Sequence, residues 1–455
     1  METRPLPAEL LAAAEADCGR LEVPGAAIGV LFEGTAYAGG VGVTNVDHPL
    51  PVTAETLFQV GSTTKPFTAA AVMQLVEMGL VELDAPVRRY LPWFALASQA
   101  DAERVTVRDL LTHHGGFAGD YFKDTGRGDD ALERIVRKMA RSPQLVPAGS
   151  HFSYCNSGFY VLGLIVAELS GRPYEQAVRE RLLEPLGMGM SFFFPEECMV
   201  HRFAAGHVVT AEGPRPARPW ATARSIAPGG GLISTVVDQL RWAAFHLGEL
   251  EAREVLSPGT VAFMRQPQRP AGSMCAEIGI SWMLDDAGGG ERLVKHGGAT
   301  NGQLSAFELV PGRRFAVTVL TNADTGREAR QTIADRCQEY FLGFGKPGVP
   351  AGDAGDPAEA AELAGRYEAT LAVLEVEAAP GGRLTIRDRA PERMLAEREH
   401  RPVPAPPAAL ARMALDRWVV ADGPRRGERV EFLRDEAGRP AWLRWDGRLA
   451  RRSGH

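Results

Sequence analysis

Cysteine is scarce in this chain and lacks the spacing of a disulfide framework or a zinc site. The 455 residues include five cysteines and no C-x-x-C pair; they stand at Cys18, Cys155, Cys198, Cys275 and Cys337. An odd and scattered set is typical of free thiols in a reducing compartment. We therefore expect all five cysteines to be unpaired.

An export signal, a membrane-spanning stretch and an excess of basic charge are also missing. The first 20 residues carry Glu2, Glu9, Glu15 and Asp17 and no basic start followed by an apolar run. The most apolar stretch, residues 159–167, is too short to span a bilayer. A net charge of −7 does not indicate the excess of basic residues that nucleic-acid binding requires. These absences predict a cytoplasmic protein with neither a membrane nor a nucleic acid as partner; they say nothing about its oligomeric state.

The length and the pattern of elements predict more than one domain, because 455 residues exceed a single compact core. Residues 8–20 and 63–78 have helical spacing, and residues 26–32 form a buried strand followed by a Gly-rich hairpin at 39–42. Residues 106–240 are mostly helical, with loops at 115–119 and 228–231. Alternation over 277–284, 292–296, 304–310 and 314–321 predicts antiparallel strands, and a helix follows at 327–342. Strands at both ends with helices between favour one α+β domain over residues 1–343.

A second unit follows a segment rich in Pro, Gly and Ala. Residues 344–362 are predicted to be a linker. Residues 363–455 contain short strands with turn signals at Gly381-Gly382 and Asp446-Gly447, which favour a small all-β domain. This unit has a net charge of +4, against −11 for the rest of the chain, so the two parts could attract each other. We expect it to modify access to a site, or to act only as a stabilising domain.

Three short motifs carry chemistry. Ser62-Thr63-Thr64-Lys65 opens the helix at 63–78, Tyr154-Cys155-Asn156 lies farther along, and His296-Gly297-Gly298 ends a strand. Residues three apart share a helix face, so Lys65 can reach the Ser62 hydroxyl. A serine hydroxyl needs a base to become a nucleophile, and a lysine kept neutral by burial can serve. The helix start also offers free N–H groups for a developing oxyanion.

The first two motifs are rare enough to be informative. With 15 serines and 5 lysines in the chain, about 0.16 S-x-x-K matches are expected by chance. With 8 tyrosines and 4 asparagines, about 0.07 Y-x-N matches are expected. H-x-G is expected about once by chance and is also satisfied by His113 and His114, so the third motif depends on its setting.

Together, the segments FQVGSTTKPFTAA, SYCNSGFYVLG and KHGGATNGQLSAFELVPG resemble the three signatures of the serine β-lactamase and penicillin-binding protein superfamily. The class C-like branch, which includes D-aminopeptidases, D-alanyl-D-alanine carboxypeptidases and esterases, is the most similar. The resemblance covers about residues 10–343. It implies a β-lactamase-like α+β fold with an antiparallel sheet and a helical subdomain. Residues 363–455 resemble the lipocalin-like β-barrel attached to some members.

The resemblance implies a role for each matching position. Ser62 would form an acyl-enzyme, Lys65 and Tyr154 would move protons, and Asn156 would hold the substrate amide. The backbone N–H groups of Ser62 and Ala299 would form the oxyanion hole. In the third signature His296 would replace lysine, with Gly298 lining the substrate site, as in the D-aminopeptidase branch.

Several residues have alternative interpretations. Lys295 could begin the third signature instead of His296, but adjacent strand residues face opposite ways, so only one lines the site. We predict that His296 lines the site, because Gly298-Ala299-Thr300 then falls where the superfamily has its Gly-Ala-Thr or Gly-Ser-Thr sequence. Cys155 lies between two site residues and is expected to pack rather than react. His113-His114 does not have the spacing of a metal pair. We therefore predict no metal site and no cofactor.

Two enzymatic functions fit these residues. The first is a serine hydrolase acting through an acyl-enzyme on amides or esters of small peptides, with a possible D-preference. The second is a stand-alone thioesterase of the penicillin-binding type, which cyclises nonribosomal peptides by acyl transfer. A non-catalytic scaffold is disfavoured by the intact Ser62, Lys65, Tyr154 and Asn156 set, and a cell-wall carboxypeptidase by the missing export signal.

Overall fold

A nine-stranded sheet is built from both ends of the first unit, as the return of strand patterns after residue 277 predicts. The computed structural model describes residues 1–349, 352–392, 406–423 and 425–454. The sheet has the strand order β1 (Thr3–Pro5), β3 (Thr35–Gly42), β2 (Gly25–Phe32), β13 (Phe315–Thr321), β12 (Leu304–Val310), β11 (Glu291–Ala299), β10 (Met283–Gly288), β9 (Glu277–Ile278), β8 (Arg269–Pro270). Only the edge pair β1–β3 is parallel; the other pairs are antiparallel. In the centre Val319 lies opposite Ile28, so the two ends of the unit share one sheet.

Helices cover both faces of this sheet. Helices α1 (Ala8–Arg20) and α12 (Gly326–Leu342) pack on one face and enclose an apolar core that includes Ile28, Val317 and Ile333. Helix α10 (Val236–Leu247) packs on the other face against β2 and β13, and α2 (Lys65–Glu77) lies beyond it in the largest core. Inside that core the rings of Phe67 and Trp242 stack 4.1 Å apart. This α+β architecture confirms the expected fold class.

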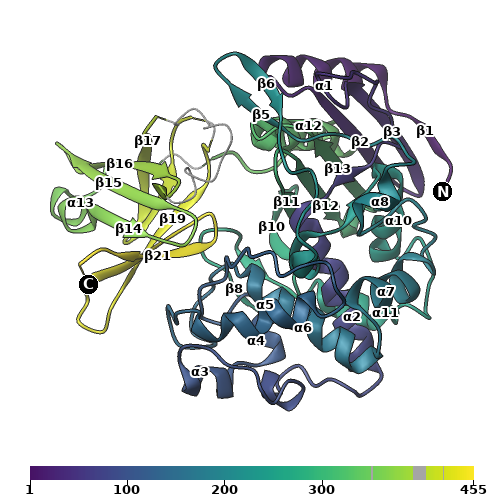
Figure 1. Ribbon diagram of the computed structural model, residues 1–455. Coiled ribbons are helices and arrows are strands. Elements are labelled where there is room, and N and C mark those ends of the chain that lie inside the picture. Colours follow the sequence, from purple (N-terminus) through teal and green to yellow (C-terminus); the bar gives the residue numbers. More distant parts are fainter. Residues whose placement is uncertain (350–351, 393–405, 424, 455) are drawn as a thin grey trace.

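A helical layer lies below the sheet in the view of Figure 1, and its helix α6 packs against α2. Its helices are α3 (Gln99–Arg104), α4 (Val107–Leu111), α5 (Ala131–Lys138), α6 (Asn156–Ser170), α7 (Tyr174–Val178), α9 (Ala227–Gly230) and α11 (Pro258–Met264). The short helix α8 (Pro195–Cys198) lies higher in Figure 1, near α10. The first unit also has two short two-stranded sheets, β4 (Phe58–Gln59) with β7 (Ile233–Ser234) and β5 (His207–Thr210) with β6 (Gly213–Pro216). The β5–β6 pair lies at the top of Figure 1, on the side of α1 and α12. Among the residues that the structure describes, no helix is both long and apolar enough to cross a membrane.

Three local expectations were wrong. The hairpin after β2 turns at Glu33 and Gly34, which both have positive φ, and residues 39–42 lie within β3 instead. Glycines suit that strand because a Cβ at Gly40 would lie 2.5 Å from the Val52 carbonyl oxygen. The strand predicted over 277–284 is interrupted between β9 and β10, where Ser281 has a φ of 70°. The loop predicted at 228–231 is largely the short helix α9.

The C-terminal unit is a closed barrel of eight antiparallel strands. They are β14 (Gly365–Glu368), β15 (Val373–Ala379), β16 (Arg383–Arg389), β17 (Ala408–Ala414), β18 (Arg417–Val420), β19 (Arg429–Arg434), β20 (Pro440–Trp445) and β21 (Arg448–Arg452). Pairing of Tyr367 in β14 with Arg452 in β21 closes it. Buried aromatic side chains fill the interior, among them Tyr367, Trp418 and Phe432. The barrel confirms the predicted all-β unit, and both predicted turns occur; strands β17 and β21 had no clear signal.

The segment predicted to be a linker, residues 344–362, is partly helical. Helix α13 (Pro357–Leu363) begins there, with Asp356 accepting a hydrogen bond from the Ala358 N–H at its start. Its Ala360 and Leu363 side chains are buried in the core of the barrel. The segment whose Pro, Gly and Ala content suggests a linker therefore also contains part of a helix that packs on the core of the barrel.

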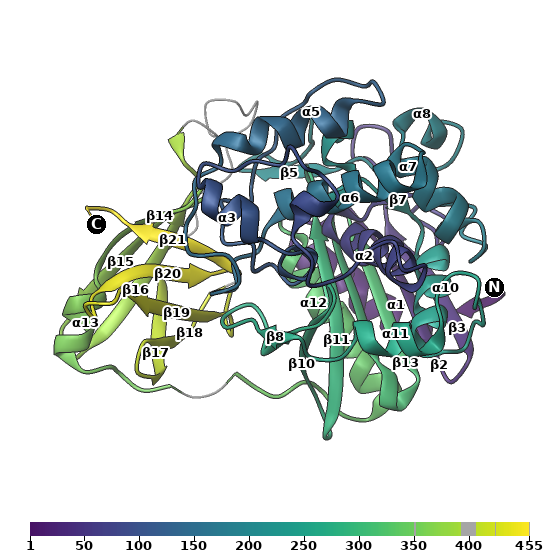
Figure 2. The ribbon, with the colours of Figure 1, turned by 90° about the horizontal axis from the view of Figure 1, so that it is seen from below.

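The barrel contacts the first unit through its last hairpin, β20–β21, and through strand β19. Figures 1 and 2 show the barrel beside the helical layer, with the C-terminus on it and the N-terminus at the opposite end of the molecule. Arg444 of β20 is buried; its Nη1 donates to the Phe152 carbonyl at 2.9 Å and its Nε donates to Glu431 at 3.0 Å. Arg429 of β19 also lies 3.5 Å from Asp285 of β10. These contacts between basic barrel residues and the acidic first unit agree with the opposite net charges.

Arg444 therefore provides a test of how firmly the two units are joined. We expect Arg444→Met to lower the free energy of unfolding by about 3 kcal/mol, because it leaves Glu431 and the Phe152 carbonyl without their buried partner. Urea unfolding followed by tryptophan fluorescence measures this change. Arg439→Met is the control, because Arg439 is exposed and, among the described residues, forms its ion pair with Asp435 four residues away; it should leave unfolding nearly unchanged. An equally small effect of Arg444→Met would show that the contact adds little.

Candidate active site

Ser62 and Lys65 are brought together at the start of α2. Residues Gly61–Thr64 form a 3₁₀ turn, and the α-helix begins at Lys65 rather than at residue 63, with Pro66 in its first turn. Lys65 Nζ donates to Ser62 Oγ at 3.0 Å and to the Gly229 carbonyl at 2.5 Å. The predicted reach of the lysine to the serine is therefore present. Ser62 itself is half-buried, while Lys65 is fully buried.

The surroundings of Lys65 disfavour its charged form. Burial lowers its pKa well below the ordinary value, and the positive charge of Arg448 lowers it further. Asp120 and Cys155 act in the opposite direction, with a smaller effect than burial. A neutral amine at hydrogen-bond distance from a hydroxyl is the arrangement of a general base and its nucleophile.

Tyr154 and Asn156 lie near the nucleophile, where α6 begins. The Lys65 amine lies 5.0 Å from the centre of the Tyr154 ring. Burial raises the pKa of the Tyr154 hydroxyl, which a hydrogen bond to Ser62 partly offsets, so this tyrosine is protonated near neutral pH. Cys155 between them points away: its Sγ accepts a hydrogen bond from the Gly158 N–H and caps α6. The thiol thus packs and caps, as we expected.

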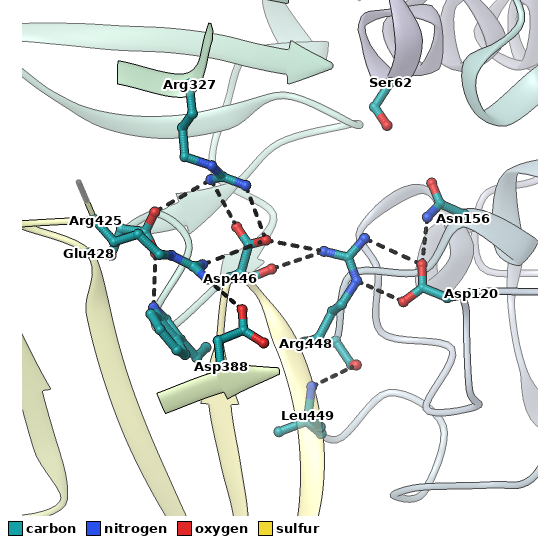
Figure 3. Close-up of polar contacts among 12 residues, drawn as sticks. Ser62, Asp120, Asn156, Arg327, Asp388, Arg425, Glu428, Asp446, Arg448 and Leu449 are labelled. Carbon is teal, nitrogen blue, oxygen red and sulfur yellow. Dashed lines mark hydrogen bonds and ion pairs between the residues drawn. The ribbon is translucent and has the colours of Figure 1, made fainter. Parts of the chain in front are cut away.

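The amide of Asn156 has a fixed orientation. Its Nδ2 donates to Asp120 Oδ1 at 2.6 Å, and both residues are buried. Its oxygen, which accepts no hydrogen bond from the residues that the structure describes, points to the side of Ser62 (Figure 3). An amide oxygen in this position can accept a hydrogen bond from a substrate N–H. Asp120 had no motif of its own in the sequence.

His296, rather than Lys295, lies near the other site residues. The His296 ring is 6.3 Å from the Tyr154 ring, whereas the Lys295 amine pairs with Asp285 at 2.8 Å. His296 Nδ1 must carry the proton, because it contacts the Gly297 carbonyl at 2.7 Å and a carbonyl can only accept. Burial and the nearby Lys65 lower the pKa of His296 to about 3. Its Nε2 is thus a neutral acceptor, and within the described residues it has no hydrogen-bond partner.

Gly61 and Gly298 let strand β11 approach the nucleophile closely. A Cβ at Gly298 would lie 1.9 Å from the Val60 carbonyl oxygen and 2.9 Å from the Ser62 nitrogen. Gly61 has a φ of 54°, and a Cβ there would lie 2.7 Å from the Ala299 nitrogen. Side chains at either position would separate the two segments. The backbone nitrogens of Ser62 and Ala299, predicted to form the oxyanion hole, therefore lie close to each other.

His113 is a buried neighbour that the motifs did not reveal as part of this site. Its ring stacks on Tyr154 with centres 4.4 Å apart, and its Nδ1 accepts the Cys155 N–H. Its Nε2 therefore carries the proton. Among the described residues, no group of three or more His, Cys, Asp or Glu side chains is placed to hold a metal ion. His113 instead packs against the ring of Tyr154.

A family model described as beta-lactamase matches residues 11–339, which is most of the chain and contains every predicted site residue. The chain belongs to the β-lactamase family. This family includes the penicillin-binding proteins, and its members are generally serine hydrolases. The resemblance of the three signatures is thereby confirmed at the level of the family.

Relatives of this β-lactamase-family chain carry several names. Penicillin-binding protein 4 of Amycolatopsis lactamdurans is 38% identical over 76% of this chain and 93% of its own length. An unguisins hydrolase of Aspergillus campestris is 27% identical over 67% of this chain, and the match spans 59% of that relative. Among solved structures, SurE is 28% identical with a TM-score of 0.76 and covers 98% of both chains. A penicillin-binding protein homologue from Pyrococcus abyssi, described as octameric, has a TM-score of 0.66 at 26% identity, over 94% of this chain and 96% of its own. These two structural matches extend over the barrel as well as the first unit.

The contact between Gly298 and the Ser62 turn can be tested directly. We expect Gly298→Ala to slow covalent labelling of Ser62 by a fluorophosphonate ~10²-fold, because the added methyl group pushes β11 away and misplaces the reacting groups. Labelling rate and melting temperature are measured together. Gly189→Ala is the control, since nothing lies within 4 Å of a Cβ there. Equal labelling rates in the two variants would show that this close approach is not needed.

Proposed function

We propose that this protein is a serine hydrolase that cleaves amides or esters of small peptides through an acyl-enzyme on Ser62. The observation that supports this most is the 3.0 Å hydrogen bond between Ser62 Oγ and a fully buried Lys65 whose pKa is lowered. Exposed lysines are charged at neutral pH and cannot accept a proton. Here burial shifts the amine toward the neutral form, which can accept one.

The proposed acylation uses each group once. Lys65 takes the proton of Ser62 as Oγ bonds to the substrate carbonyl carbon. The negative oxygen of the tetrahedral intermediate is held by the backbone N–H groups of Ser62 and Ala299. When the bond to the leaving group breaks, the proton passes from Lys65 through the Tyr154 hydroxyl to that group. A tyrosine protonated near neutral pH suits such a relay.

In deacylation the proton movements are reversed, and water is the acceptor of the acyl group. Lys65, with Tyr154, removes a proton from the attacking water, which bonds to the acyl carbon as the bond to Ser62 breaks. Ser62 regains its proton and the carboxylic acid leaves. If an amine of the same peptide attacks instead of water, the product is a cyclic peptide, so the cyclase alternative differs only in the acceptor.

Substrate binding is proposed to depend on two acceptors. The Asn156 oxygen and the unpartnered Nε2 of His296 both suit substrate N–H groups, which fits a peptide backbone clamped between α6 and β11. Attack from one face then favours one configuration at the neighbouring carbon. A D-preference is supported by SurE, which is 27% identical and whose structure was determined with D-Leu. The relative named as an unguisins hydrolase also fits a peptide-related substrate.

The acyl-enzyme is tested by labelling with a fluorophosphonate. We expect mass spectrometry to find the adduct on Ser62 in the wild type and none in Ser62→Ala. Lys65→Ala and Tyr154→Phe should each reduce turnover of a p-nitrophenyl ester ~10²–10⁴-fold, the usual cost of losing a proton-transfer group. Circular dichroism checks that the fold is kept. Labelling that survives Ser62→Ala, or wild-type turnover in both Lys65→Ala and Tyr154→Phe, would contradict the mechanism.

The substrate class is tested by a paired panel. We expect faster cleavage of D-alanine than of L-alanine amides and p-nitrophenyl esters. Attack from one face should favour one enantiomer, and the resemblance to D-aminopeptidases and the SurE structure with D-Leu support the D form. Rates by absorbance and chromatography give the ratio. Linear peptidyl thioesters are added to the panel. A clear preference for L substrates would remove the D-specific proposal, and cyclic products with little amide hydrolysis would establish the cyclase alternative.

A further inference from the structure

The last hairpin of the barrel reaches the candidate active site. The turn between β20 and β21 contains Asp446 and Gly447, and the Tyr154 N–H donates to the Gly447 carbonyl at 2.8 Å. The Leu449 N–H of β21 donates to Ser153 Oγ at 3.3 Å. Backbone hydrogen bonds from the barrel therefore hold the segment that carries the predicted proton-transfer tyrosine.

Arg448 extends from this hairpin to Asp120 (Figure 3). Its Nε donates to Asp120 Oδ2 at 2.7 Å and its Nη2 donates to Oδ1 at 3.3 Å. The same Oδ1 accepts the Asn156 amide at 2.6 Å. Arg448 also lies over the Tyr154 ring, 5.0 Å from its centre. A bidentate guanidinium holds a carboxylate in one plane, so the position of Asp120 depends on the barrel.

The guanidinium of Arg448 is itself held from behind. Its Nη1 donates to the Asp446 carbonyl at 3.2 Å and lies 3.7 Å from the Asp446 carboxylate. That carboxylate also pairs with Arg327 of α12 at 3.4 Å and with Arg425 at 3.8 Å. Despite the opposing effect of burial, these arginines hold the pKa of Asp446 below its usual range. Asp446 is therefore a fixed anion that positions Arg448 between the barrel and the first unit.

The charges of Arg448 and Asp120 act on Lys65 in opposite directions. Arg448 lowers the pKa of Lys65 and Asp120 raises it. The other titratable groups around Lys65 are uncharged near neutral pH: burial raises the pKa values of Tyr154 and Cys155 and lowers those of His113 and His296. The site thus gains a strong acceptor for the Asn156 amide without leaving an unbalanced negative charge beside the amine.

We propose that Arg448 is a positioning residue of the active site, which acts through Asp120 on Asn156 and balances the charge of Asp120 beside Lys65. The proposal rests on the function proposed above. The barrel then serves the chemistry of the site, beyond the role in access that the sequence suggested. Asp120 connects the two, because its carboxylate bonds both Arg448 of β21 and the Asn156 amide.

The pH dependence of Ser62 acylation tests this in the full-length chain, with a p-nitrophenyl ester as substrate. In Arg448→Met the unbalanced Asp120 stabilises the protonated amine, so the acid limb of kcat/KM moves to higher pH by about one unit. The value of kcat/KM at its plateau should fall ~10²-fold as Asn156 loses its orientation. Arg448→Lys keeps the charge, so its acid limb stays in place while the plateau falls.

Asp120→Asn is predicted to shift the profile in the opposite direction. It leaves Arg448 unbalanced, which favours the neutral amine, so the acid limb moves to lower pH. In the double variant Arg448→Met, Asp120→Asn both charges are gone, and the limb returns toward its wild-type position. Arg434→Met is the control: Arg434 pairs with Asp416 and Glu362 within the barrel, so its loss should change neither the limb nor the plateau.

Three results would overturn the proposal. The first is an Arg448→Met profile that keeps its shape and falls no more than that of Arg434→Met. The second is an acid limb that does not move in Asp120→Asn, which decides the matter if Arg448→Met does not fold. The third is a wild type that is never acylated at Ser62, which would remove the proposed function and this proposal with it. A wild type that is acylated normally, with acid limbs that do not move, would remove this proposal alone.

Discussion

The hydrogen bond between Lys65 and Ser62 is the interaction on which the rest of the site depends. It links two residues three apart in the sequence, so the local helix start suffices to bring them together. Proximity alone does not make the lysine a base, because an ordinary lysine is charged at neutral pH. The amine becomes a base only where water is excluded and nearby charges are balanced. Much of the structure around α2 can be understood as meeting that condition.

Exclusion of water comes from three directions. The core beneath α2 buries the lysine stem, α6 brings Tyr154 and Asn156 against it, and β11 closes the remaining side. The approach of β11 is possible because Gly61 and Gly298 have no side chains, as contacts of 1.9–2.9 Å for an added Cβ make plain. The same approach sets His296 near the tyrosine. Burial of the base and the position of His296 near the tyrosine are thus consequences of one packing arrangement.

The balance of charge involves the barrel. Arg448 and Asp120 lie on different units, and their pairing joins the units and neutralises the surroundings of Lys65. Arg327 and Asp446 extend the same set of ion pairs to α12 on the far side of the sheet. The full-length match to SurE shows that the combination of both units occurs in a related structure. The hairpin β20–β21 is therefore a structural part of this site as well as a boundary of the barrel.

The sequence by itself determined the local features of this protein. Periodicity located α1, β12 and α12 to within a residue or two, and the two rare motifs identified Ser62, Lys65, Tyr154 and Asn156. Strand alternation required that only one of His296 and Lys295 line the site, and the resemblance of Gly298-Ala299-Thr300 to the third signature favoured His296. Each of these inferences needs only neighbours within a few residues. The roles predicted for these residues come from the resemblance, and the geometry is consistent with them.

Only the tertiary structure decided which distant residues surround the motifs. Asp120 and Arg448 are 328 residues apart, and in a barrel with 18 arginines nothing local distinguishes Arg448 from the others. His113 was recognised as a histidine pair with His114, but its stacking on Tyr154 depends on how α4 packs against α6. Strands β17 and β21 lacked a clear alternating pattern, since pairing with neighbours rather than propensity fixes such strands. Local order follows from the covalent chain, whereas burial and charge balance arise only when separate segments pack together.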